Sequence, residues 1–151
     1  VANLMLKPIG EAEGPLRSAF RSADPVIRQW ALTSCAAFGD SASELIEAAK
    51  PLLRDEDPIV QVRAAEFLGL VGAVDPRGTL IEVINDSDHP VVHLIAFNGV
   101  ALFHDHSKTS YPFEAEDFVG VKGEAERRIL YLQGDWIGKK PNRKKGKKGK
   151  K

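Results

Sequence analysis

The sequence predicts an all-α protein that folds as an α-solenoid of about three helical pairs with a C-terminal capping helix. Three segments of the 151-residue chain align on Pro25, Pro58 and Pro90, which are 33 and 32 residues apart. Counted from each proline, positions 2, 6, 10 and 13 are apolar in all three segments. This spacing is typical of the buried stripe of a helix, and repeats of this length with two helices each stack into solenoids.

Each proline begins a predicted helix, because proline suits the first helical turn. Asp24 and Asp57, which precede two of the prolines, can accept hydrogen bonds from free backbone amides. Gly39 and Gly72 follow position 13 in the first two segments and can end those helices in a left-handed conformation. His104 takes that place in the third segment, which predicts a weaker helix end.

Shorter apolar patterns lie between these helices and end just before the next proline. They predict partner helices at roughly residues 15–22, 43–54 and 77–85. Pro51 falls inside the second partner helix and is expected to bend or interrupt it. Each pair of helices then buries its apolar stripe against its neighbours.

The chain is expected to divide into four parts. Residues 1–14 are a lead-in from an excised or processed upstream region, because the chain begins at Val1 without methionine. Residues 15–104 hold the repeats, and residues 105–138 form a capping segment with one more helix near residues 124–132. Two aromatic groups, Tyr111 to Phe113 and Trp136, are expected to pack this segment back over the last repeat.

Residues 139–151 are expected to be a disordered basic tail. The zero net charge of the chain hides nine Lys or Arg and no acid in this tail, so that 12 basic residues face 21 acidic ones in the rest. A segment of this kind is typical of polyanion binding, to nucleic acid, an anionic membrane surface or a sulfated polysaccharide, and the alternative is a solubilising tail. The residues assigned to polyanion binding are Lys139, Lys140, Arg143, Lys144, Lys145, Lys147 and Lys148.

The run from Asp24 through Pro25 and Arg28 to Ala31 resembles the second helix of HEAT repeats. This resemblance covers about residues 15–104, and it implies a scaffold of stacked helical pairs. In that family the arginine tends to be shared between neighbouring repeats. Here Gln61 and His93 replace it in the later repeats, which puts the same bonding in doubt there.

A second resemblance is to the C-terminal helical module of planctomycete-type sulfatases, through the lysine-rich tail and the Asn3-Leu4 pair near the start. It implies a catalytic domain upstream and a periplasmic or extracellular location. The chemistry would lie outside this chain, because the residues after Cys35 do not form the motif that sulfatases need.

No catalytic residue, cofactor or metal is predicted for this chain. His93 and His104 lie about 16 Å apart along one helix, which excludes a single four-histidine site. Two smaller candidate metal sites are left, one at the helix start (Asp88, His89 and His93) and one at the helix end (His104, Asp105 and His106). Both are better explained without a metal, because His93 stands where the HEAT resemblance has arginine and a histidine at a helix C-terminus interacts favourably with the helix dipole. Cys35 occupies a core position, where a thiol acts as a small apolar group.

The face of the three proline-started helices opposite the core stripe is almost uncharged and is the candidate docking site. Apolar exposed surface often marks an interaction site, so we expect this inner face to dock another domain, a subunit or the chain's own C-terminal segment. The alternative is an array that curls and buries the face itself. The assigned residues are Val26, Gln29, Ile59, Val62, Glu66, Val91, Leu94 and Asn98.

The expected function is that of a non-catalytic interaction or accessory module, with a sulfatase-like hydrolase as the implied parent. The alternative is a free-standing scaffold that binds a polyanion through its tail. No apolar run is long enough for a membrane span.

Overall fold

The chain folds into paired helices, as the repeat pattern predicts. The computed structural model describes residues 1–105 and 111–132, and this part of the chain contains helices and no strand. None of its helices is long and apolar enough to cross a bilayer. The α-helices, and the 3-10 helices labelled η, are η1 (Ala2–Leu6), α1 (Ile9–Ala19), α2 (Pro25–Phe38), η2 (Gly39–Leu45), α3 (Ile46–Ala49), η3 (Lys50–Arg54), α4 (Pro58–Leu70), α5 (Arg77–Asp86), α6 (Pro90–Asp105), η4 (Ala115–Asp117) and α7 (Glu124–Leu132).

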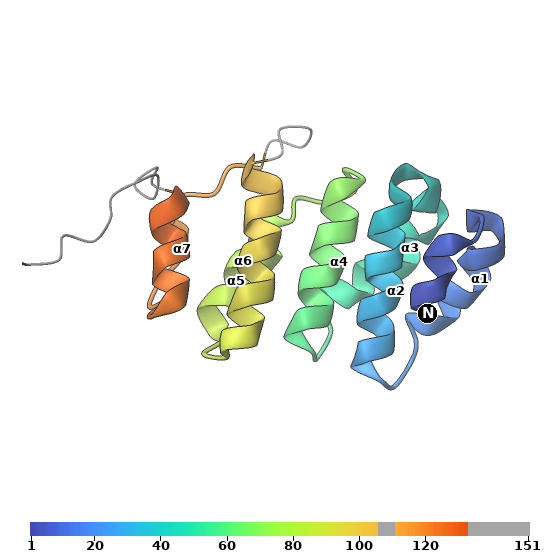
Figure 1. Cartoon of the computed structure of the whole chain (residues 1–151), viewed down its shortest axis with the longest axis horizontal. Coiled ribbons are helices and arrows are strands. Elements are labelled where there is room, and N and C mark those ends of the chain that lie inside the picture. Colours follow the sequence, from blue (N-terminus) through green and yellow to red (C-terminus); the bar gives the residue numbers. More distant parts are fainter. Residues whose placement is uncertain (106–110, 133–151) are drawn as a thin grey trace, which may run out of the picture.

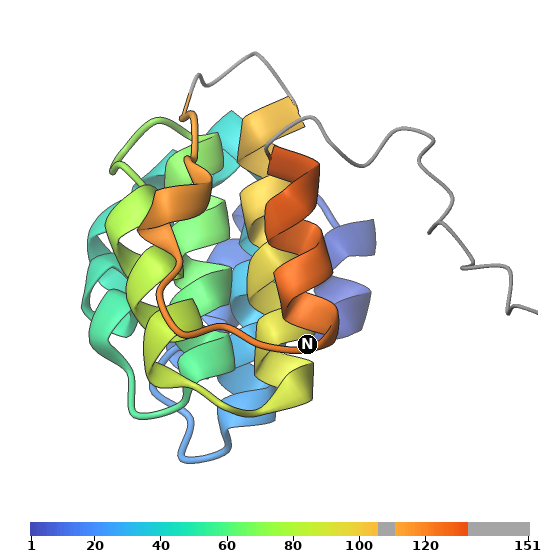
Figure 2. The ribbon, with the colours of Figure 1, turned by 90° about the vertical axis from the view of Figure 1, so that its left-hand side faces the viewer.

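The helices form two layers. Helices α2, α4, α6 and α7 stand side by side in one row, which we call the second-helix layer, and α1, α3 and α5 lie behind it (Figure 1). A view along the row shows the chain after Tyr111 crossing the end of the array before it enters α7 (Figure 2). This arrangement is that of an all-α solenoid with a helix placed against its last repeat.

The predicted helix starts and ends are confirmed by local hydrogen bonds and backbone angles. Asp24 Oδ1 accepts from the amide two residues on at 2.9 Å, and Asp57 Oδ1 does the same at 2.9 Å. His89 Nδ1 takes this role before α6, at 3.2 Å. Gly39 and Gly72 have φ values of 56° and 68°, which glycine adopts without steric cost.

The first partner helix starts earlier than predicted. Helix α1 begins at Ile9 and not at residue 15, so the expected boundary of the lead-in at residue 14 falls inside it. Pro15 removes one helical hydrogen bond, but Ala12 and Leu16 lie on one face and are fully buried. The burial of these two side chains stabilises the helix on both sides of the exposed Pro15. Before α1 in the chain, η1 packs against α2.

The second partner helix is interrupted, as Pro51 predicts, although it is broken into more pieces than expected. The chain passes from η2 through the short α3 to η3, and Pro51 lies in the first turn of η3. The third partner helix, α5, matches the predicted range of 77–85 to within one residue.

Two apolar clusters fill the space between the layers, and α4 contributes to both. Val60 and Leu68 of α4 pack with α1 and α2, whereas Val62 and Ala65 pack with α5 and α6. Of the predicted core positions, Ile27 is 36% exposed, whereas its equivalents Val60 and Val92 are buried. Among the described residues, the short η1 is what packs against α2 ahead of α1 in the chain. Helix α4 is therefore enclosed on both sides along the row.

Candidate interaction surface

The exposed side of the second-helix layer carries large apolar side chains on its first and third long helices. On α2, Val26 is 53% and Trp30 45% exposed, and they lie one turn apart. On α6, Val91 is 48% and Leu94 46% exposed, at a similar spacing. These two exposed strips lie on helices that are separated by α4 (Figure 1).

Neither strip contains a charged side chain. Arg28 is the only charged residue between Pro25 and Phe38, and it is buried. The predicted docking residues Gln29 and Asn98 are uncharged, and Asn98 Oδ1 accepts from Arg128 of α7 at 3.0 Å. The two exposed strips are therefore apolar or neutral where water reaches them.

The middle helix does not continue this exposed face, which corrects the prediction for two residues. Val62 is fully buried among side chains of α5 and α6, and Glu66 is 8% exposed. Ile59 is partly buried. The arc of α4 that holds Val62 and Glu66 is covered by α5 and α6, whereas Val26 on α2 and Val91 and Leu94 on α6 remain about half exposed.

Glu66 forms an ion pair within this covered arc. Arg63 Nη1 donates to Glu66 Oε2 at 2.6 Å. A methyl group at Gly99 would lie 3.3 Å from Glu66 Oε1, so the absent side chain at residue 99 makes room for the carboxylate beside α6. Burial raises the pKa of Glu66, and the nearby Arg63 opposes this.

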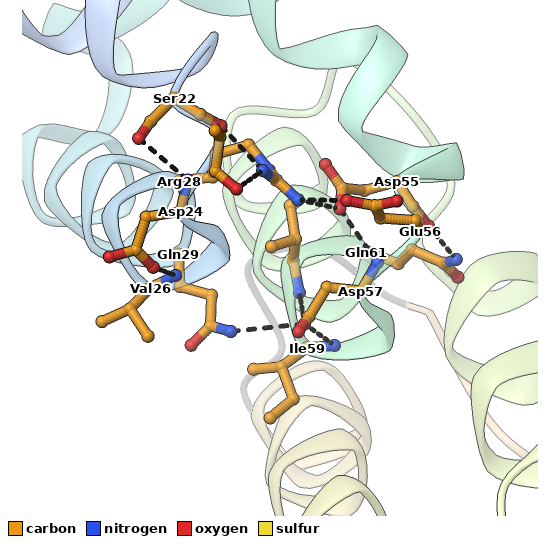
Figure 3. A network of polar contacts seen from close by, with 12 residues as sticks. Ser22, Asp24, Val26, Arg28, Gln29, Asp55, Glu56, Asp57, Ile59 and Gln61 are labelled. Carbon is orange, nitrogen blue, oxygen red and sulfur yellow. Dashed lines mark hydrogen bonds and ion pairs between the residues drawn. The ribbon is translucent and has the colours of Figure 1, made fainter.

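A second polar network joins the first two repeats at the N-terminal ends of α2 and α4 (Figure 3). Arg28 Nη2 donates to Asp55 Oδ1 at 2.7 Å, and Arg28 Nη1 donates to the carbonyl of Ser22 at 2.7 Å. Both charged side chains are nearly buried, at 8% and 7% exposed. The hydrogen bond to Asp55 raises the pKa of Arg28.

The residues that replace this arginine in later repeats bond only within their own repeat. Gln61 Nε2 donates to the carbonyl of Asp55 at 2.6 Å, and His93 Nε2 lies 3.0 Å from the carbonyl of Ile84. Each ties its helix to the loop or helix before it. Of these three residues, only Arg28 bonds to the following repeat. Gln61 and His93 therefore do not make the bond between repeats that the arginine makes.

Asn85 makes two hydrogen bonds to the backbone of the segment that crosses the end of the array, and Phe113 and Phe118 of this segment are buried in the core. Asn85 Nδ2 donates to the carbonyl of Asp117 at 3.0 Å, and Asn85 Oδ1 accepts from the amide of Val119 at 2.9 Å.

Between this segment, α6 and α7 lies a cavity of about 370 Å³. The sequence reasoning missed this cavity, and it also left Trp30 out of the candidate face, although an aromatic residue among polar positions is a recognisable signal.

The other candidate groups do not assemble a reactive site. Cys35 is fully buried, and burial raises the pKa of its thiol to about 12, so it stays protonated at neutral pH. Within residues 1–105 and 111–132, no three His, Cys, Asp or Glu side chains lie close enough to hold a metal. His106, Trp136 and the tail lysines lie outside the described residues.

Comparison with known proteins agrees with this geometry. A family model described as HEAT repeats matches residues 13–99. No curated protein and no solved structure matches the chain, and nothing supports the sulfatase resemblance. Proteins of this family generally mediate protein–protein interactions and are typically non-catalytic. Because the match covers more than half of the sequence, and because the helices pair and stack as the repeats require, the chain belongs to the HEAT repeat family.

Proposed function

We propose that this chain is a non-catalytic interaction module that docks a protein partner through the exposed strips of α2 and α6. The assignment keeps Val26, Gln29, Val91, Leu94 and Asn98 from the predicted face and adds Trp30. It leaves out Val62 and Glu66, because both are buried, and Ile59, because it is partly buried against the cluster of α5 and α6.

The observation that carries this proposal is the combination of exposure and missing charge. Val26, Trp30, Val91 and Leu94 are each close to half exposed in a layer of helices with no charged side chain on either strip. Tryptophan is enriched among the residues that dominate binding energy at protein interfaces. Protein interfaces are also depleted of charge at their centre, which matches these strips.

Site-specific photo-crosslinking tests this face. A photoreactive phenylalanine derivative at Trp30 is introduced into the full reading frame that contains this chain and is irradiated in the source cells. The matched control carries the same group at Glu82, which is exposed on α5 in the other layer. We expect a defined protein adduct from position 30 and none from position 82.

A lysine substitution decides whether the adduct depends on the apolar strip. Val26→Lys places a charge one turn from the probe, so the adduct is expected to disappear, whereas Glu82→Lys leaves it unchanged. Equal adducts from both probe positions, or an adduct that survives Val26→Lys, would contradict docking through this face. Sedimentation of the purified chain shows whether the partner is a second copy.

Two finer proposals concern the surroundings of the module. A sulfatase parent requires a sulfatase nucleophile motif upstream in the same reading frame, and a frame without it would dismiss that parent. Polyanion binding by the tail is favoured by its nine basic residues alone. Retention on heparin over a salt series, compared with a chain truncated after residue 138, tests it, and identical retention would leave only a solubilising role.

A further inference from the structure

The cavity at the end of the array has the size and the walls of a small-molecule site. Its volume is about 370 Å³, and proteins hold small ligands in cavities of about 300–1,000 Å³ that have mostly apolar walls and a few polar groups. The apolar walls are Leu94 and Phe97 from α6, Val121 from the crossing segment and Ala125 from the first turn of α7. Phe97 and Ala125 are buried, whereas Leu94 is 46% exposed, so the walls lead from the core to the surface.

The wall formed by the crossing segment is attached to the last repeat by packing and by hydrogen bonds. Phe118 is buried, and the centre of its ring lies 5.2 Å from that of Phe97. Asn85 bonds to the backbone on both sides of Phe118. These contacts hold the stretch with Val121 and Lys122 beside α6, because both residues follow directly in the chain.

Two cationic side chains line the cavity near the start of α7. Lys122 lies two residues before the first residue of α7, and Arg128 lies three residues after Ala125, on the same side of the helix. Arg128 Nη1 donates to Asn98 Oδ1 of α6 at 3.0 Å, and a guanidinium carries four more N–H groups. Among the side chains that the structure describes, neither Lys122 nor Arg128 forms an ion pair.

The other titratable residues of the lining leave the cavity with a positive balance. Asp88 is the acidic residue among the described residues that line it, and this exposed side chain pairs with neither Lys122 nor Arg128. His93 Nε2 lies 3.0 Å from the carbonyl of Ile84, so this ring is bonded to the last turn of α5. Two cations and one acid around apolar walls favour an occupant that combines a negative group with an apolar body.

We propose that this cavity binds a small organic acid. The carboxylate of the acid binds Lys122 and Arg128, since ammonium and guanidinium groups form charge-assisted hydrogen bonds with carboxylates. The apolar body packs against Leu94, Phe97 and Val121. The volume of about 370 Å³ equals that of about 12 molecules of liquid water, so an acid with a similar number of non-hydrogen atoms fills it.

Titration of the isotope-labelled full chain with phenylbutyrate, followed by the NMR shifts of its backbone amides, tests the proposal. This probe has an aromatic ring, a short apolar chain and a carboxylate. We expect saturable shifts at the cavity residues Leu94, Val121 and Ala125, with a dissociation constant on the order of 1 mM for a ligand of this size. The neutral phenylbutyramide has nearly the same shape and should bind roughly fivefold more weakly.

Charge substitutions show whether the lining selects the acid. Lys122→Gln and Arg128→Gln each remove one cation and should weaken binding of phenylbutyrate roughly two- to fivefold. Asp88→Asn removes the opposing acid and should strengthen binding by a similar factor, which a damaged fold would not do. Lys7→Gln is the control, because it makes the same charge change at an exposed residue just before α1, at the other end of the array (Figure 1), and should leave binding unchanged.

Two variants of α6 test the apolar wall. Leu94 lines the cavity and Val91 does not, although both are about half exposed. Leu94→Gln should weaken binding of both probes, whereas Val91→Gln should leave it unchanged. Far-UV circular dichroism checks that each variant is folded. Leu94 also belongs to the proposed docking strip, but the titration contains no protein partner, so its result is independent of that docking.

Three results would overturn the proposal. The lack of any saturable shift at several times the expected dissociation constant shows that the cavity does not hold the acid. Equal binding of acid and amide, or equal effects of Lys122→Gln, Arg128→Gln and Lys7→Gln, shows that the cations do not select a carboxylate. Shifts confined to the strip around Trp30 place the ligand on another surface.

Discussion

Replacing Arg28 by methionine should strongly destabilise the array, because it removes the arginine that joins the first two repeats. The change removes the hydrogen bonds to Asp55 and to the carbonyl of Ser22, both 2.7 Å long. It also leaves the carboxylate of Asp55 without a cation in a site where its side chain is only 7% exposed. Methionine keeps much of the apolar stem, so the loss is mainly that of the polar network.

The expected magnitude follows from the burial of this pair. Breaking a buried ion pair on one side costs roughly 3–5 kcal/mol. Glu56, 3.7 Å from Arg28, is 87% exposed, so water reaches one edge of the network. We therefore expect the lower end, a loss of about 3 kcal/mol in the free energy of unfolding. For a chain of this size, this corresponds to a decrease in Tm of about 6–12 °C.

Urea unfolding followed by far-UV circular dichroism measures this loss. Arg17→Met is the matched control, because Arg17 likewise donates to a carboxylate, that of Glu13 at 2.9 Å, and to a carbonyl of the second repeat, that of Glu44 at 2.8 Å, but its side chain is 40% exposed. Its expected cost is at most about 1 kcal/mol. Arg28→Lys should fall between the two, since an ammonium group cannot fork to both loops. If Arg28→Met cost no more than Arg17→Met, the structural role given to Arg28 would be wrong.

Three further predictions use the same measurement or a simple chemical assay. The pKa of Glu66 is raised in the folded chain, so ionisation of this group disfavours the fold as pH rises. The stability of the natural chain relative to Glu66→Gln should therefore fall as the pH rises above about 4, the ordinary pKa of a glutamate, and a constant difference would contradict this. Gly69→Ala should destabilise the chain by about 1–3 kcal/mol, because the new methyl group would lie 2.7 Å from the ring of Phe103. Gly78→Ala, which meets open space in a helix, should instead stabilise it by about 0.5–1 kcal/mol, and equal effects of the two alanines would refute the packing argument. Cys35, buried and with a thiol pKa of about 12, should react with a disulfide reagent only as fast as the chain unfolds; fast labelling of the folded chain would show that it is accessible.

The exposed strips on α2 and α6 are the part of the candidate site that the sequence predicted. Absence of charge on α2 and α6 can be read from the residues, and both helices do leave that arc open. The same pattern on α4 gave the wrong result for Val62 and Glu66, because periodicity says which residues share a face but not how many neighbours cover it. The cavity at the end of the array could not be predicted, since it is formed by two stretches, residues 84–97 and 119–128, that are distant along the chain.

The sequence by itself determined where the second helix of each repeat begins and that the chain forms a HEAT array. Those features depend on interactions within a few residues, such as Asp24 accepting from the amide two positions on and Gly39 adopting a positive φ. Only the tertiary structure decided that α1 continues through Pro15, that α4 is enclosed, and that Arg28 alone of its three equivalents spans two repeats. Burial and bridging depend on which helices pack together, and that is a property of the assembled layers and not of any single helix.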